Sequence, residues 1–220
     1  MRLRLLLLTV PVLAAPFAAY YGPPLTGAAY WIVNFVTLVL VPAGYLAFVF
    51  RMGARAADIG LKPLTQDYPV HRCLKIVVVC TLIYLAYVPI ANMAAALVGD
   101  ASESSALEQF PVPLGRVGLV AIAYYALVAA VFEEIVFRGV LGFIFIKDGS
   151  RVRYLMYILC SAALFTALHI PSHDIPDLAG TLYLGLASAI LYIRIRNVSP
   201  LIIAHFILDV YILGWATYVQ

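Results

Sequence analysis

The chain has 220 residues, of which 65% are apolar or aromatic and only 11% are charged, and its mean hydropathy is +1.00. Soluble domains contain about 45–50% apolar and about 25% charged residues. The composition therefore excludes a disordered chain, a nucleic-acid-binding module and a disulfide scaffold, and it predicts a helical protein whose solvent is the bilayer.

Seven apolar segments follow one another along the chain, each bounded by charged residues, proline or glycine. They are Leu5–Tyr21, Ala28–Phe50, Leu74–Val98, Val117–Ile146, Tyr154–Ile170, Leu178–Ile193 and Leu201–Tyr218. A membrane-spanning helix needs about 20 apolar residues. The pattern predicts an all-α, polytopic membrane bundle of about seven transmembrane helices. Since no repeat or linker interrupts it, we expect residues 1–220 to form a single membrane domain.

The first segment has an alternative interpretation. Arg2 and Arg4 followed by Leu5–Val10 resemble the start of a signal peptide. No clear small-residue cleavage site follows, because Phe17 and Tyr20 occupy the relevant positions. We therefore favour a helix that is retained, and cleavage would leave the remaining topology unchanged.

Lysine and arginine are distributed unevenly between the connections. If the N-terminus is cytoplasmic, the inner loops hold 12 of the 14 basic residues, whereas the outer loop 99–116 contains Asp100, Glu103 and Glu108. Cytoplasmic loops of membrane proteins carry an excess of Lys and Arg. The distribution predicts a multi-pass protein of the cell membrane with a cytoplasmic N-terminus, and it is typical of a bacterial inner membrane.

Six ionisable residues lie inside the apolar segments. They are Glu133, Glu134, Arg138, His169, His205 and Asp209. A charge at the bilayer centre costs at least about 2.5–3.5 kcal/mol on insertion scales. Six such residues on three helices therefore indicate a functional site.

Glu134 and Arg138 are four residues apart, which places them on one helix face as an ion pair. Glu133 points away from that pair and has no partner in its own helix. One carboxylate is thus neutralised and the other is available as a base. The alternative is that all three residues only fix helix packing.

The two membrane histidines come from later helices. His205 and Asp209 are again four residues apart, a spacing that suits a metal half-site, a proton relay or a base with its orienting acid. At about 1.5 Å per residue, Glu133 and His169 both lie about 20–24 Å from the inner surface. His205 lies only about 13 Å deep, unless the helix that carries it begins deeper in the membrane.

The ordered motifs resemble those of the CPBP intramembrane proteases, a family that includes the CAAX prenyl endopeptidases and the bacterial Abi proteins. The motifs are Glu133-Glu134-x-x-x-Arg138, Phe165-x-x-x-His169 and His205-x-x-x-Asp209, and the segment Asp58–Leu61 is also similar. The resemblance covers about residues 115–215, which we expect to form the protease core. It implies a helical bundle that encloses a polar cavity.

The resemblance also implies roles for the individual residues. Glu133 would be the general base that activates water, and His169 would assist it. His205 and Asp209 would hold the oxyanion of the tetrahedral intermediate. Asp209 departs from the usual asparagine of the family, and an ionised aspartate has no hydrogen to donate. Asp209 is therefore either protonated or orients His205.

Glu134 and Arg138 would give structural support, and the glutamate mechanism needs no cofactor. A zinc site built from His169, His205 and Asp209 is the less favoured alternative. We interpret His173, beyond the fifth segment, as a solvated loop residue rather than a metal ligand or a partner of the site.

We expect an intramembrane endopeptidase that hydrolyses a peptide bond of a membrane-associated peptide or protein, such as one with a C-terminal sorting helix. The expected partners are this substrate and the lipid bilayer, with no nucleic acid. A prenylated CAAX substrate is less favoured, because the charge pattern is typical of bacterial membranes. The alternative functions are a proton-coupled transporter and a non-catalytic bacteriocin-immunity or scaffold protein.

Overall fold

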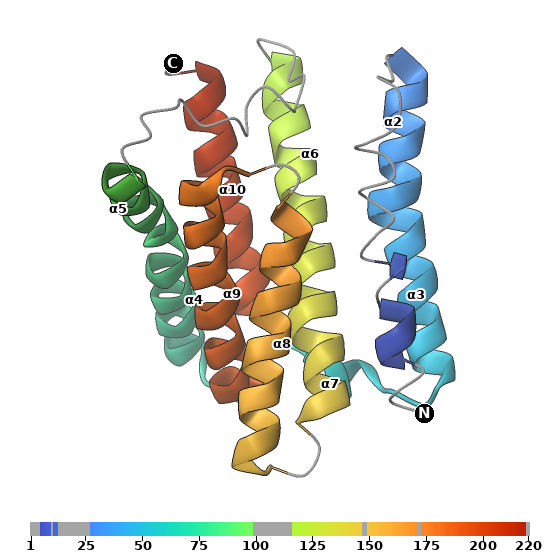
Figure 1. Cartoon of the computed structure of the whole chain (residues 1–220). Coiled ribbons are helices and arrows are strands. Elements are labelled where there is room, and N and C mark those ends of the chain that lie inside the picture. Colours follow the sequence, from blue (N-terminus) through green and yellow to red (C-terminus); the bar gives the residue numbers. More distant parts are fainter. Residues whose placement is uncertain are drawn as a thin grey trace.

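The protein folds as an all-α bundle, as predicted (Figure 1). The computed structural model describes residues 5–9, 11–12, 27–98, 116–146, 149–170 and 173–218, and none of these residues is in a strand. The helices are α2 (Gly27–Phe35), η1 (Val36–Leu40), α3 (Val41–Arg51), η2 (Ala56–Ile59), η3 (Leu64–Gln66), α4 (Val70–Leu85), α5 (Tyr87–Val98), α6 (Arg116–Glu133), η5 (Glu134–Val140), α7 (Leu141–Phe145), α8 (Arg151–His169), α9 (Ile175–Ile195) and α10 (Ser199–Tyr218).

Several of these elements join end to end into helices of membrane-spanning length. Five are long and apolar enough to cross a bilayer: Trp31–Arg51, Val70–Val98, Gly118–Phe145, Arg151–His169 and Ile175–Ile195. The apolar part of α10, Ser199–Gly214, is somewhat shorter. These six helices coincide with the second to seventh predicted segments. Most of the first predicted segment lies outside the described residues.

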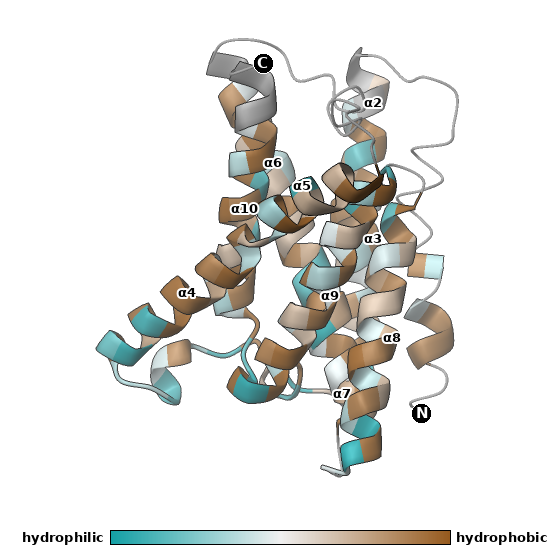
Figure 2. Ribbon diagram, turned by 60° about the vertical axis from the view of Figure 1, so that its left-hand side comes forward, coloured by the Kyte–Doolittle hydropathy of each residue, from teal (hydrophilic) through white to brown (hydrophobic). Residues whose placement is uncertain are grey.

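Successive helices run in opposite directions, so one end of the bundle collects the basic residues. In Figure 1, α3, α7 and α9 end at the lower side, and α4, α8 and α10 begin there. Arg51 ends α3, Arg151 begins α8, and Arg194 lies in the last turn of α9. Figure 2 shows hydrophilic residues at the lower ends of α4, α8 and α9. This alternation agrees with the uneven charge distribution, whereas the cytoplasmic location of the N-terminus stays a prediction.

The last two helices lie at the centre of the packing. Helix α9 packs against α5 and α8, while α10 packs against α4 and α6. The helix formed by α2, η1 and α3 is more peripheral and meets α6 through η1. Helix α6, which ends at Glu133, therefore packs directly against α10, and η5, which contains Glu134 and Arg138, contacts both α8 and α9.

The connection after α3 folds into the bundle and holds the start of α10. Ile59 is fully buried, and its carbonyl approaches Gly139 so closely that a Cβ atom there would lie 2.6 Å away. Gly60 adopts a φ of +77°, and its carbonyl accepts a hydrogen bond of 3.1 Å from the Val198 N–H. Because Asn197 and Val198 are both fully buried, α10 begins inside the protein, which brings His205 deeper than its distance along the chain suggests.

Candidate active site

The first acidic motif lies where the α-helix changes to a π-helix. Glu133 is the last residue of α6, and Glu134 begins the π-helical segment η5, which also contains Arg138. π-helical turns are rare and occur frequently at functional sites. Arg138 Nε lies 3.2 Å from Glu134 Oε2, and both side chains are fully buried. The predicted ion pair is confirmed.

Arg138 has further partners on two other helices. Ser188 of α9 accepts hydrogen bonds from Arg138 Nε, at 2.7 Å, and from Nη2. The guanidinium carbon lies 4.4 Å from the centre of the Phe165 ring on α8, in a cation–π arrangement. Arg138 thus links η5, α8 and α9 around one buried positive charge.

His205 connects both glutamates of the motif with Asp209. Its Nδ1 lies 2.9 Å from Glu134 Oε1, and its Nε2 lies 3.8 Å from Glu133 Oε2 and 3.5 Å from Asp209 Oδ1. The carboxylate of Glu134 accepts the Nδ1 hydrogen, because an ionised carboxylate has none to donate. Nε2 therefore faces the two other carboxyl groups of the cluster.

Access from solvent differs between these acids. The side chain of Glu134 is fully buried, whereas Glu133 is 13% exposed and Asp209 is 21% exposed. Glu133 Oε2 makes no hydrogen bond with the described part of the protein. The side chains of Glu133 and Asp209 are therefore partly exposed, although Glu133 Oε2 itself is buried, while Glu134 lies behind the His205 ring.

His169 lies beside the cluster and has one nitrogen committed. His169 Nδ1 donates to the Phe165 carbonyl at 2.7 Å, and the rings of these two residues are 4.8 Å apart. The Phe165 ring is also 6.2 Å from the His205 ring. In neutral imidazole, a hydrogen on Nδ1 leaves Nε2 as an acceptor. A water molecule shared by Glu133 and His169 stays a prediction.

The structure also shows contacts that the sequence interpretation missed. His173 is half-buried, and its ring lies 4.8 Å from that of His169 in an edge-to-face arrangement, so it is a neighbour of the site rather than a solvated loop residue. Tyr84 of α4 is fully buried with its ring 5.8 Å from that of His205. Neither Tyr84 nor Ser188 belongs to a recognisable motif, and no sequence signal distinguishes them from other residues in apolar helices.

The chemistry of the cluster suits hydrolysis. Three carboxyl groups surround the His205 imidazole, and one of them, that of Glu134, also pairs with the Arg138 guanidinium. A water next to Glu133 would have a proton acceptor on one side. In its doubly protonated form, His205 would also offer the Nε2 hydrogen as a donor in the same region, because its Nδ1 hydrogen is taken by Glu134. In the described part of the chain, no group of three or more His, Cys, Asp or Glu side chains has an arrangement suited to a metal ion, and metal independence itself stays a prediction.

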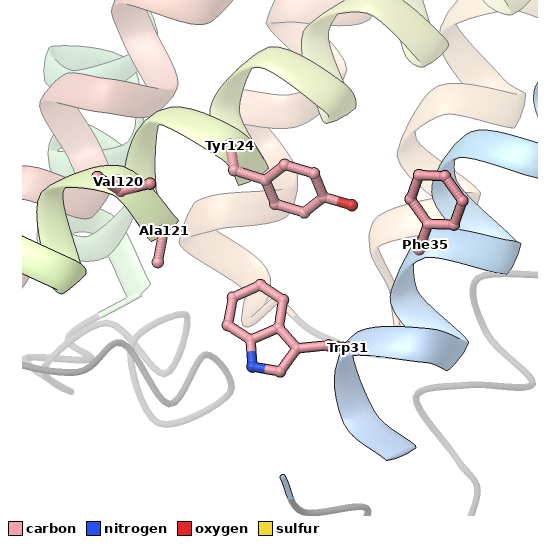
Figure 3. Close-up of a pocket in the computed structure, with 5 residues that line it drawn as sticks. All are labelled: Trp31, Phe35, Val120, Ala121 and Tyr124. Atoms are coloured by element: carbon pink, nitrogen blue, oxygen red, sulfur yellow. The ribbon is translucent and has the colours of Figure 1, made fainter. Parts of the chain in front are cut away.

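A separate apolar groove lies between α2 and α6 (Figure 3). It has a volume of about 480 Å³ and is lined by Trp31, Phe35, Val120, Ala121 and Tyr124. The Trp31 ring stacks on that of Tyr125 at 5.8 Å and meets Tyr124 at 6.1 Å. These aromatic contacts join α2 to the part of α6 that precedes Glu133 in the chain.

Comparison with known protein families finds a match to the motif-bearing region. The family model of type II CAAX prenyl endopeptidases, Rce1-like, matches residues 115–211. This range contains all three motifs, and the match confirms the family resemblance inferred from them. No curated protein and no solved structure matches the chain.

Proposed function

We propose that this protein, whose residues 115–211 match the family model of type II CAAX prenyl endopeptidases, is an intramembrane endopeptidase of the glutamic type. Its substrate is a membrane-associated peptide or protein, and its N-terminus faces the cytoplasm. The family match supports peptide-bond hydrolysis in general. The identity of the base and of the oxyanion donor is argued from the side chains of the site.

The observation that carries the proposal is the placement of His205 between the two glutamates. Glu134 is fully buried behind the imidazole, and Arg138 Nε neutralises its charge at 3.2 Å from Oε2. Glu133 is on the accessible side, 3.8 Å from His205 Nε2. Two neighbouring glutamates thus have different environments, which separates a structural carboxylate from a reactive one.

The reaction uses a water molecule between Glu133 and the substrate carbonyl. Glu133 accepts a proton from this water, and the water oxygen forms a bond to the scissile carbonyl carbon. The carbonyl π electrons move to the oxygen. The negative charge there is stabilised by the Nε2 hydrogen of a doubly protonated His205, whose Nδ1 hydrogen stays on the bond to Glu134. Glu133 then gives its proton to the amide nitrogen as the C–N bond breaks, which releases an amine and a carboxylic acid.

His169 orients the water in this scheme. Because Nδ1 of His169 donates to the Phe165 carbonyl, its Nε2 can accept a hydrogen bond from the water. Glu133 and His169 would then each accept a hydrogen bond from the water. These two bonds would direct a lone pair of the water oxygen to the substrate. Such positioning reduces the entropic part of the barrier.

The experiment that tests the function measures cleavage by the purified full-length protein in detergent micelles or nanodiscs. Two sets of quenched fluorescent peptides serve as probes: one ends in an apolar helix followed by basic residues, and the other ends in a farnesylated CAAX sequence. Cleavage of either set, with the scissile bond located by mass spectrometry, supports the proposal and distinguishes the substrate classes. If the protein cleaves neither set but conducts protons in proteoliposomes, the transporter alternative replaces it.

Asp209→Asn is expected to retain substantial activity, with kcat/KM within about tenfold of the unmodified protein. Asparagine keeps an oxygen near His205 Nε2, which now lies 3.5 Å from Asp209 Oδ1, and it adds an N–H donor for the oxyanion. It is also the usual residue of the family that the motif resembles. Asp209→Ala serves as the comparison and is expected to lose more activity. A thousandfold loss in Asp209→Asn would show that the negative charge of Asp209 is essential.

Removal of metal ions is expected to leave the rate of cleavage unchanged. The proposed mechanism assigns the water to Glu133 and His169 and the oxyanion to His205, so no step requires a Lewis acid. The purified protein is treated with a chelator, its metal content is measured, and cleavage is followed before and after zinc is added. Activity that disappears with the metal and returns with one equivalent of zinc would overturn the glutamate mechanism.

A further inference from the structure

Tyr84 brings helix α4 to the site, from the part of the chain that the family match does not cover. It is the penultimate residue of the 16-residue helix α4 and lies outside the matched residues 115–211. Its side chain is fully buried, and its ring is tilted by 51° against the His205 ring at 5.8 Å. Such a position next to a site residue would suit an apolar side chain, so the hydroxyl needs an explanation.

The Tyr84 hydroxyl makes no hydrogen bond with the described residues, although it is buried beside other polar groups. Its nearest polar surroundings include the Glu134 carboxylate and the Ser188 hydroxyl. A buried hydroxyl without a partner is unfavourable. A movement of the side chain that forms a hydrogen bond with one of these groups is therefore favourable.

Of these two groups, Glu134 has the free acceptor. Ser188 Oγ already accepts from the Arg138 guanidinium and donates to the Leu184 carbonyl at 2.5 Å. The Oε1 atom of Glu134 takes the hydrogen of His205 Nδ1. Its Oε2 atom is near Arg138 Nε, at 3.2 Å, but makes no hydrogen bond of good geometry. The orphaned donor of Tyr84 and the orphaned acceptor of Glu134 thus complement each other.

We propose that Tyr84 is a positioning residue that donates a hydrogen bond from its hydroxyl to Glu134 Oε2 and so holds His205 in place. Fixing Oε2 prevents rotation of the carboxylate, which keeps Oε1 aligned with His205 Nδ1. The opposite nitrogen, Nε2, then keeps its place beside Glu133. The inference rests on the proposed role of His205 at the oxyanion, and it makes α4 part of the active unit.

The first test compares Tyr84→Phe with Tyr45→Phe by cleavage kinetics. Tyr45 is a buried tyrosine of α3 whose hydroxyl pairs with Thr9 at 2.5 Å, so its substitution also removes a buried hydroxyl but lies outside the site. Tyr84→Phe is expected to lower kcat about tenfold with KM unchanged, and Tyr45→Phe is expected to retain the wild-type kcat. Equal kcat in Tyr84→Phe and the unmodified protein would overturn the proposal.

The second test does not depend on cleavage. The NMR resonance of the His205 Nδ1 hydrogen is observed in protein labelled with ¹⁵N-histidine and is assigned by its loss in His205→Gln. In Tyr84→Phe, Glu134 receives one donor fewer and accepts the His205 hydrogen more strongly, so the resonance moves downfield. Replacement of Tyr84 by 3-fluorotyrosine keeps the shape of the side chain and makes its hydroxyl a stronger donor, so the resonance moves upfield. This variant provides the test if Tyr84→Phe folds poorly.

The two tests separate this inference from the proposed function. Opposite shifts of the resonance in the two Tyr84 variants, with none in Tyr45→Phe, support the link between Tyr84, Glu134 and His205 even if no probe peptide is cleaved. An unmoved resonance in both Tyr84 variants overturns the inference even if the protein is an active protease.

Discussion

Glu133→Gln is expected to reduce cleavage by at least about a thousandfold, the upper part of the range for loss of a general base. Glutamine has nearly the same size and keeps one oxygen, but its amide cannot accept the proton of the water. The side chain is the accessible member of the glutamate pair, 3.8 Å from His205 Nε2. Initial rates with the fluorescent peptides, measured at enzyme concentrations high enough to detect the residual activity, give the change.

Two further variants make this result specific to Glu133. Glu133→Asp keeps the carboxylate but withdraws it by about 1 Å or more, so it is expected to leave little activity. Asp177→Asn makes the same carboxylate-to-amide change in α9, where Asp177 Oδ1 faces the Tyr87 hydroxyl at 3.4 Å, and is expected to remain active. Full activity of Glu133→Gln would show that a group other than Glu133 is the general base.

Local patterns in the sequence predicted the helices and the pairs within them. Six apolar segments became helices at the expected positions, because continuous apolar runs of this length have few other stable structures in a bilayer. The pair of Glu134 and Arg138 follows from a separation of four residues, which places two side chains on one helix face. Both predictions depend only on residues close together in the chain.

Contacts between helices were less accessible to prediction, because they depend on the rotation and depth of each helix. The estimate from the chain placed His205 too close to the inner surface. It did not include the inward fold of the connection near Ile59 and Gly60, which accepts the Val198 N–H and sets the buried start of α10. The sequence also gave no reason to place Tyr84 against His205.

Arg138→Ala is expected to destabilise the fold as well as to reduce activity. Arg138 is fully buried between Glu134, Ser188 and the Phe165 ring. Its removal leaves the Glu134 charge without compensation, and breaking a buried ion pair in this way costs about 3–5 kcal/mol. We expect a low yield and a lower melting temperature in detergent, measured by circular dichroism or the fluorescence of a thiol-reactive dye.

The chain contains a matched ion pair for comparison. Arg55 and Asp58 are 3.2 Å apart, the same separation as in the buried pair, but the Arg55 side chain is 82% exposed. Water and salt screen such a pair, so Arg55→Ala is expected to change the melting temperature little. Glu134→Gln combined with Arg138→Ala should recover part of the lost stability, because the double variant has no uncompensated charge at Glu134. A normal yield and melting temperature of Arg138→Ala alone would contradict a structural role for the pair.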